Sequence, residues 1–184
     1  MWVLLVVAVV AILWVIGAYN GLISLKNQTV NAFKQIDVQL KRRHDLIPNL
    51  VNAVKGAMDF ERSTLEAVVN ARNQAMKAEG VKQISQAENA LSGALSRLMV
   101  TVERYPQLKA TANIGQLQEE LTSTENRIAF ARQLYNDTAT QYNTKQQQFP
   151  TTLVAGIANA SLTDLWEIEA PAERAVPAVD LSTR

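Results

Sequence analysis

The chain contains one histidine, His44, and a histidine can act as a general base or as a metal ligand. Arg42 and Arg43 precede it, and Asp45 follows it. The two adjacent cations disfavour a second positive charge on the imidazole, and no residue stands at the spacing of a base or ligand partner. We therefore predict a solvated or hydrogen-bonded histidine on a basic helix face, not a catalytic centre.

Other residue types that carry chemistry are scarce as well. Glu119 and Glu120 are adjacent carboxylates, but neighbouring helix residues point about 100° apart, so a solvated face is expected there. The chain has no cysteine, which excludes disulfides, thiolate metal sites and cysteine nucleophiles. No glycine-rich loop follows a strand pattern to cradle a phosphate. We predict no catalytic residue, no metal site, no cofactor and no enzymatic activity.

The basic triplet of Lys41, Arg42 and Arg43 has two readings. It could contact anionic lipid headgroups, or it could be solvated or face other parts of the protein. A helix that leaves a bilayer at Asn20 would place Lys41 roughly 30 Å away, several Debye lengths at physiological salt. Lipid contact would require the helix to bend down onto the surface, so we favour the solvated or protein-facing role.

The first stretch, Met1 to Tyr19, contains no charged side chain, and no acidic or basic residue follows before Lys26. From Trp2 to Tyr19 a helix would rise roughly 26 Å, close to the roughly 30 Å of bilayer hydrocarbon, with an aromatic residue at each interface. The rival interpretation is a cleaved secretory signal. That requires a basic segment before the apolar run and a small-x-small site after it. The chain meets neither requirement convincingly, so a retained membrane anchor fits better.

Gly17 and Gly21 form a Gly-x-x-x-Gly pair at the end of this span. Such pairs let helix backbones approach closely in lipid, which predicts a homo-oligomer of packed anchors. The alternative is that the glycines only loosen the exit from the membrane. Lys26 and Lys34 follow the span, so the positive-inside rule favours a bundle in the cytoplasm, with a periplasmic or extracellular bundle left open.

Composition favours an all-α fold. Lys and Arg total 18 against 17 Asp and Glu, a net charge of +1 that gives no field to attract nucleic acid. Few aromatics, with many Ala, Gln, Asn and Leu, favour helices over a sheet. We divide the 184 residues into an anchor (1–21), an antiparallel helical bundle (22–149) and a tail with a short apolar patch (150–184).

Apolar periodicity outlines the helices of this bundle. After the anchor, apolar residues at helical spacing continue the first helix, with an expected stripe of Val30, Phe33, Leu40, Ile47, Val51 and Val54. Pro48 predicts a kink or a new helix start with Asp45 as its N-cap. A second helical stretch covers 49–77, where Gly56 and a capping-box pattern at 63–66 are candidate interruptions, and a third covers 83–105. The longest runs over 114–148. Its expected buried seam, in coiled-coil steps of 4 and 3, is Leu117, Leu121, Thr124, Ile128, Ala131, Tyr135, Thr138 and Tyr142.

Six stretches of the chain form a recognisable pattern: Tyr19–Leu22, Gln35–Lys55, Leu65–Arg72, Ala87–Leu98, Tyr105–Lys109 and Leu117–Pro150. In these stretches the chain closely resembles the LemA family. The most specific one is the signature Lys41, Arg42, Arg43, His44, Asp45, Leu46, Ile47, Pro48, Asn49 and Leu50. The resemblance implies a bacterial single-pass protein of the cell membrane with a long antiparallel helical bundle and no assigned activity or cofactor. The tail departs from the pattern, with Leu165-Trp166 where relatives carry a Tyr-Phe segment.

Two functions are compatible with these features. The first is a non-enzymatic scaffold, anchored in the bilayer, that assembles with itself and organises the membrane or its proteins. The second is an adaptor that binds a membrane partner such as a protease or a sensor kinase. A scaffold would self-associate when purified alone, whereas an adaptor would stay monomeric until its partner is added.

Overall fold

The computed structural model describes residues 1–55, 62–105 and 112–167. These residues form helices and connecting segments without a strand, so the all-α prediction is confirmed. The helices are α1 (Trp2–Lys55), α2 (Arg62–Ala75), α3 (Gly80–Glu103), α5 (Ala112–Gln147) and α6 (Thr152–Ile157). The predicted break at Gly56 lies outside the described residues.

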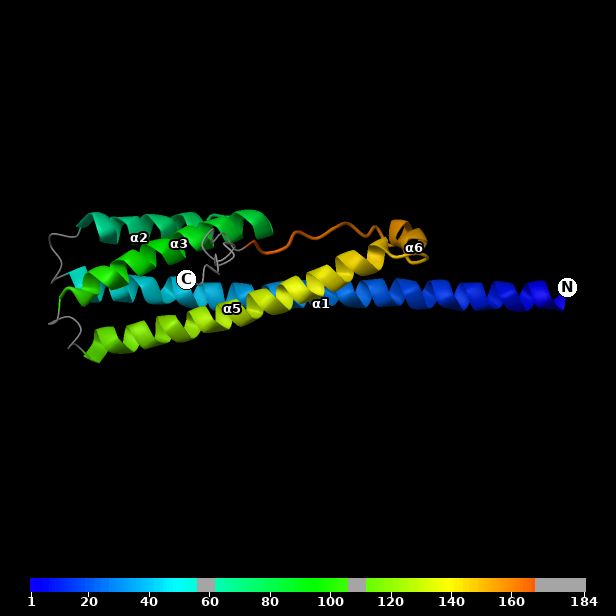
Figure 1. The fold of residues 1–184 in the computed structure, drawn as a ribbon, viewed down its shortest axis with the longest axis horizontal. Coiled ribbons are helices and arrows are strands. Elements are labelled where there is room, and N and C mark those ends of the chain that lie inside the picture. Colours follow the sequence, from blue (N-terminus) through cyan, green and yellow to red (C-terminus); the bar gives the residue numbers. More distant parts are fainter. Residues whose placement is uncertain (56–61, 106–111, 168–184) are drawn as a thin grey trace, which may run out of the picture.

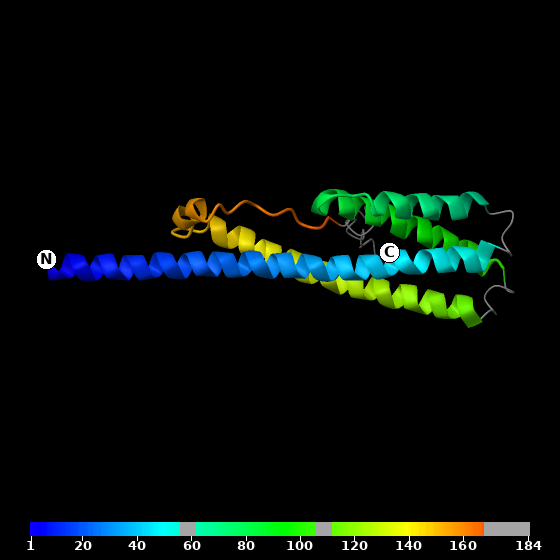
Figure 2. The same cartoon turned by 180° about the vertical axis from the view of Figure 1, so that it is seen from behind.

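Successive long helices run in opposite directions. α1 extends from the N-terminus through the whole length of the molecule, α2 returns, α3 runs outward again and α5 comes back along α1 (Figure 1). Seen from behind, α6 and the segment after it lie beside α1, on the side of α2 and α3 (Figure 2). α1 packs most extensively on α5, and α2 packs on α3. The apolar N-terminal part of α1 projects beyond the end of α5 without a neighbouring helix.

α1 is a single 54-residue helix that passes through Pro48, so the predicted new helix start with an N-cap at Asp45 is wrong. Proline lacks the N–H that would bond to the carbonyl four residues earlier, which is that of His44. The guanidinium of Arg72 in α2 donates from Nε to that carbonyl at 2.7 Å. The helix continues because a donor from a neighbouring helix replaces the one that proline removes.

The predicted seam of α5 is confirmed, because all eight of its residues are buried. The leucine stripe of α3 and its end at Val102 are buried as well. On α1 the expected stripe was partly wrong: Val30 is exposed, and the buried face runs through Thr29, Ala32 and Ile36 instead. Both stripes fit helical spacing, and the observed one brings Ala32 and Ile36 into one cluster with Ala131, Tyr135 and Ala139 of α5.

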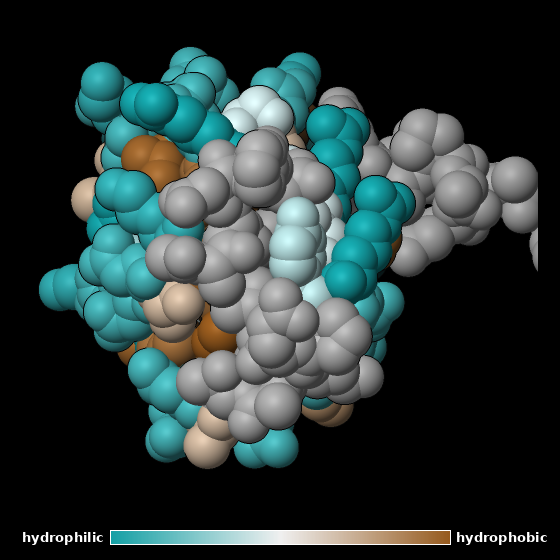
Figure 3. Space-filling view, turned by 90° about the vertical axis from the view of Figure 1, so that its left-hand side faces the viewer, coloured by the Kyte–Doolittle hydropathy of each residue, from teal (hydrophilic) through white to brown (hydrophobic). Residues whose placement is uncertain are grey.

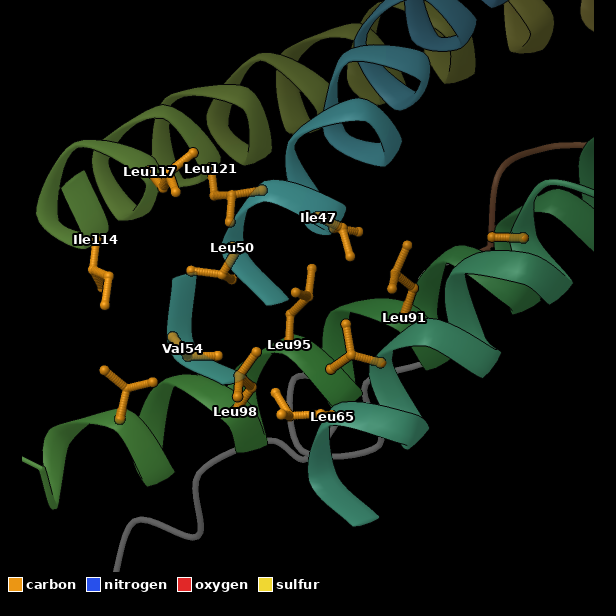
Figure 4. Packing of buried hydrophobic residues seen from close by; sticks show 13 residues of the cluster. Ile47, Leu50, Val54, Leu65, Leu91, Leu95, Leu98, Ile114, Leu117 and Leu121 are labelled. Carbon is orange, nitrogen blue, oxygen red and sulfur yellow. The ribbon is translucent and has the colours of Figure 1, made fainter. Parts of the chain in front are cut away.

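Three apolar clusters follow one another along α1. The cluster farthest from the N-terminus joins α1, α2, α3 and α5 through Ile47, Leu50, Val54, Leu65, Leu91, Leu95, Leu98, Ile114, Leu117 and Leu121 (Figure 4). The middle cluster joins α1 and α5 through Ile36 and Tyr135 and includes Trp166 of the tail. The third joins Leu22 of α1, Tyr142 of α5 and Ala155 of α6.

The tail after α6 folds back along α5 as an extended strap, residues 160–167. The side-chain amide of Asn143 accepts from the N–H of Thr163 at 2.9 Å and donates to its carbonyl at 2.8 Å. Asn136 holds Trp166 in the same way, at 2.8 and 3.1 Å. Seven helical residues rise about 10.5 Å and three extended residues about 10 Å, so the two clamps match in spacing.

Candidate functional site

The polar centre of the bundle is built around Arg43, which lies on the buried face of α1 and is 1% exposed. Its Nη2 donates to the carboxylate of Glu88 and, at 3.1 Å, to the backbone carbonyl of the same residue on α3. Its Nη1 donates to the hydroxyl of Ser92 at 3.0 Å and to the carboxylate of Glu125 on α5. One guanidinium therefore joins three helices.

His44 belongs to the same network. Its Nε2 lies 2.7 Å from Oε1 of Glu88, whose other carboxylate oxygen binds Arg43. The imidazole is 12% exposed, and Glu88 is fully buried. His44 is thus hydrogen-bonded, as the sequence suggested, but it is held inside the bundle and not on a solvated face. Its backbone carbonyl accepts the hydrogen bond from Arg72 that replaces the one Pro48 cannot donate.

Glu88 was missed from the sequence, although a signal for it exists. It occupies the buried stripe of α3, between Ser85 and Leu91, at a position where an apolar residue is expected. Arg43 interrupts the stripe of α1 in the same way, between Leu40 and Ile47. Two charges of opposite sign at inward positions of neighbouring helices indicate a buried ion pair, because such charges rarely bury unpaired.

Charges around this network balance. Arg132 of α5 adds a second cation near Arg43, close enough to interact electrostatically with the carboxylates of Glu88 and Glu125. Burial lowers the pKa of the Arg132 guanidinium, the charge of Glu125 opposes that shift, and the charge of Arg43 adds to it. The guanidinium stays protonated at neutral pH, so two cations meet two carboxylates. Arg132 also lies 4.9 Å from the ring centroid of Trp166, which connects the network to the strap.

The arrangement is suited to holding helices together. A general base needs a free lone pair aimed at a substrate, but both oxygens of Glu88 already accept hydrogen bonds within the protein. The hydroxyl of Ser92 accepts from Arg43. Across the described residues no group of three His, Cys, Asp or Glu could hold a metal ion. In some helical proteins, buried polar groups of this kind fix which helices meet and in what register.

A groove of about 550 Å³ opens beside this network between α3 and α5. Its floor is apolar, with Leu95, Val102 and Leu121, and Arg43, Ser92 and Glu125 stand among its lining residues. Met99 and Gln118 of its rim touch through an amide to thioether contact of 3.4 Å. The groove exists because α3 packs mainly on α2, and α5 mainly on α1, so the two helices diverge.

The structure divides the ten signature residues between two faces of α1. Arg43, Ile47 and Leu50 are buried, and His44, Leu46 and Pro48 are half-buried. Lys41, Arg42, Asp45 and Asn49 are exposed. The stretch therefore packs the bundle and does not converge on one surface site. The basic triplet is also divided, since Arg43 points inward while Arg42 reaches Glu120 at 3.9 Å across the surface.

The residues predicted to lie in or beside the membrane, Trp2, Gly17, Tyr19 and Gly21, all belong to the N-terminal part of α1. Trp2 is 81% exposed and Tyr19 is 39% exposed. Gly17 and Gly21 have no neighbouring atom within 4 Å of the position that a Cβ would take. The glycine faces are thus open, and within the described chain nothing packs on them.

This fold defines a class of protein: an antiparallel helical bundle whose first helix begins with one segment long and apolar enough to cross a membrane. The chain belongs to the LemA family, which it matches over residues 32–181. It is 28% identical over 181 residues to magnetosome protein MamQ 2 of Paramagnetospirillum magneticum, covering 84% of this chain and 66% of that one. It is 27% identical over 161 residues to protein LemA of Metamycoplasma hominis, covering 84% and 72%.

Proposed function

We propose that this protein is a non-enzymatic scaffold of the cell membrane, anchored by the first part of α1 and assembled through contacts between anchors. The observation that carries the proposal is α1 itself. One uninterrupted helix contains both the apolar segment and the part of α1 on which the bundle packs. None of the apolar segment is buried within the chain. Because a continuous helix is stiff, the part in the bundle keeps a fixed direction relative to the part in the anchor.

The open glycine pair supports assembly between copies. In lipid no hydrophobic force drives helices together, and association depends on close packing of small residues. Gly17 and Gly21 lie on one face of α1, four residues apart, with nothing against them. The buried polar network supports the non-enzymatic part of the proposal, because Arg43 and His44 occupy both carboxylate oxygens of Glu88, the one fully buried acid of the network.

Light scattering of the full chain in mild detergent tests this function. We expect a protein mass that is a multiple of 20.3 kDa, whereas a fragment that begins at Lys26 should be monomeric. Gly17→Leu with Gly21→Leu should shift the full chain toward the monomer. Val6→Leu with Val10→Leu changes the same span at the same spacing without touching a glycine and should leave the assembly intact. A full chain with the mass of one copy would refute self-assembly.

The groove between α3 and α5 favours a second candidate, an adaptor. Its apolar floor and polar rim suit a helix of a membrane partner, because such helices dock by an apolar face. An adaptor of this kind would be monomeric in detergent when purified alone. Leu121→Glu in the groove would then abolish capture of the partner, while Gly17→Leu with Gly21→Leu would not.

A further inference from the structure

The third apolar cluster places α6 at the membrane end of the bundle. Burial along α1 begins at Leu22, which packs with Tyr142 and with Ala155 of α6. Leu25 and Ala158 pack against the same cluster. Leu22 and Leu25 lie three and six residues beyond Tyr19, which is about 5 to 9 Å of helix rise. The headgroup layer on each side of a bilayer is about 5 to 8 Å thick.

α6 and the turn before it present large apolar side chains to the outside. Val154 and Ala155 face the bundle and are buried. Phe149, Leu153 and Ile157 stand four residues apart and are 81%, 65% and 72% exposed. We call these three residues the α6 patch. In Figure 1, α6 is the part of the bundle that reaches furthest toward the N-terminus of α1.

The charge around the α6 patch complements anionic lipid. Residues 1–36 and 138–163 contain no Asp or Glu, whereas Lys26, Lys34 and Lys145 are exposed there. Lys26 is one helical turn from Leu22, and Lys145 is three residues from Tyr142, so both stand beside the third cluster. The opposite end of the molecule presents mostly hydrophilic side chains where its residues are described (Figure 3).

We infer that the α6 patch inserts into the interface of the same bilayer that α1 spans, and that Lys26 and Lys145 contact anionic headgroups beside it. The inference rests on the proposed membrane anchor and adds a second point of attachment. Apolar side chains of a short helix at the interface bury about 5 to 10 Å deep, at the boundary of headgroups and acyl chains. Two attachment points restrict the tilt of the bundle, which a single span does not.

The absence of cysteine makes the insertion directly measurable, because one introduced thiol labels uniquely. The full chain is reconstituted in vesicles of phosphatidylcholine with phosphatidylglycerol, carrying an environment-sensitive fluorophore on Leu153→Cys or Ile157→Cys. Two sets of lipids report contact with the bilayer: a nitroxide near the headgroup quenches labels at the interface, and a nitroxide deep in the acyl chain quenches labels at the centre, such as the control in the span. Ile12→Cys in the span is the positive control. Phe130→Cys, 76% exposed on α5, is the negative control.

We expect nitroxide lipid to quench the labels at Leu153 and Ile157 to within about twofold of the label at Ile12, and to leave Phe130 unaffected. Labels at Leu153 and Ile157 that stay bright and accessible to aqueous iodide would overturn the inference. Protection from iodide without lipid quenching, growing with protein density, would also overturn it, because a second copy would then cover the patch. An unquenched Ile12 would refute the anchor itself.

The lysines are tested with the same labels. Lys26→Gln with Lys145→Gln should weaken quenching at Leu153 in vesicles with phosphatidylglycerol and have no effect in phosphatidylcholine alone. Lys41→Gln with Lys55→Gln removes two exposed lysines farther along α1 and should leave the quenching unchanged. Equal effects of the two pairs would show that the lysines beside the patch do not contact headgroups.

Discussion

Arg43 shows why this position needs a guanidinium. Its two terminal nitrogens reach one hydroxyl, two carboxylates and one carbonyl on two other helices. A lysine ammonium at the same place is a single point of charge and cannot keep that planar fork. Replacing a buried ion pair by apolar residues is often neutral for stability, whereas removing one partner leaves an uncompensated charge. We therefore expect the pair to act by selecting one arrangement of helices over others of similar stability.

Arg43→Leu should lower the free energy of unfolding by about 3 to 5 kcal/mol, because Glu88 would stay buried without its cation. The double variant with Glu88→Leu should recover most of that loss. Urea unfolding of the fragment that begins at Lys26, followed by circular dichroism, measures both. The matched control is Arg42→Leu, which alters an exposed neighbour. A double variant as unstable as Arg43→Leu alone would show that burying Glu88 is not the cause.

Tyr135 makes the stability of the fold depend on alkaline pH. Burial and the nearby charge of Asp164 raise the pKa of the Tyr135 phenol to about 12, and its hydroxyl donates to the Asp164 carbonyl at 2.7 Å. The unfolded chain loses this proton near pH 10. The folded state retains it, so this contribution is full below pH 10 and declines as pH rises toward 12.

Tyr135→Phe should therefore cost about 1 kcal/mol near pH 8 through the lost hydrogen bond. Between pH 10 and 12 the difference between the two proteins should shrink, because only the tyrosine protein loses the contribution of the phenol. Urea unfolding at a series of pH values measures the difference directly. A difference that stays constant across this range would show that the phenol does not titrate with folding.

At the scale of elements, segments far apart in sequence complete one another. α2 supplies the donor that α1 lacks at Pro48. Asn136 and Asn143 of α5 supply hydrogen-bond partners for the backbone of the strap, which has no neighbouring strand to bond with. The strap in return buries Trp166 in the middle cluster between α1 and α5, and its end meets α3, where the hydroxyl of Ser85 donates to the Glu167 carbonyl at 2.9 Å. An extended segment without a sheet is stable here because side-chain amides take the place of a neighbouring strand.

The link between α2 and Pro48 predicts an energetic coupling. Arg72→Ala should lower the free energy of unfolding by about 1 to 2 kcal/mol, since the His44 carbonyl loses its donor. In the background of Pro48→Ala the same change should cost less, because the alanine N–H reaches that carbonyl within α1. A double-mutant cycle on the fragment from Lys26 gives the coupling. Equal costs of Arg72→Ala in both backgrounds would contradict it.

At the scale of the whole molecule, one end is apolar and basic and the other is hydrophilic. The apolar part of α1, the α6 patch and the exposed lysines that follow the span all lie toward the same end. The groove between α3 and α5 lies in the other half, among residues of the cluster farthest from the N-terminus. In the proposed membrane-anchored arrangement, this shape would hold the groove well away from the bilayer.

The lysines also predict on which side the bundle stands. Lys26 and Lys34 lie within about 15 residues of the end of the span, and cytoplasmic flanks carry the excess of Lys and Arg. We expect protease added to spheroplasts to leave the bundle intact and to cut it only after lysis. Cleavage before lysis would place the bundle outside. Lys26→Gln with Lys34→Gln should increase the fraction of chains that are cut without lysis.

The sequence by itself determined what depends on local periodicity and composition. The all-α fold follows from composition, and the apolar segment of α1 follows from a long run without charge. The seam of α5 follows from apolar and small residues at steps of 4 and 3. Tertiary structure decided what depends on partners from distant segments. The hydrogen bond from Arg72 lets α1 continue through Pro48. Arg43 and His44 both bind Glu88, and Asn136 and Asn143 bind the strap. Each of those outcomes needs a donor or acceptor at least 20 residues away, and local propensity carries no information about it.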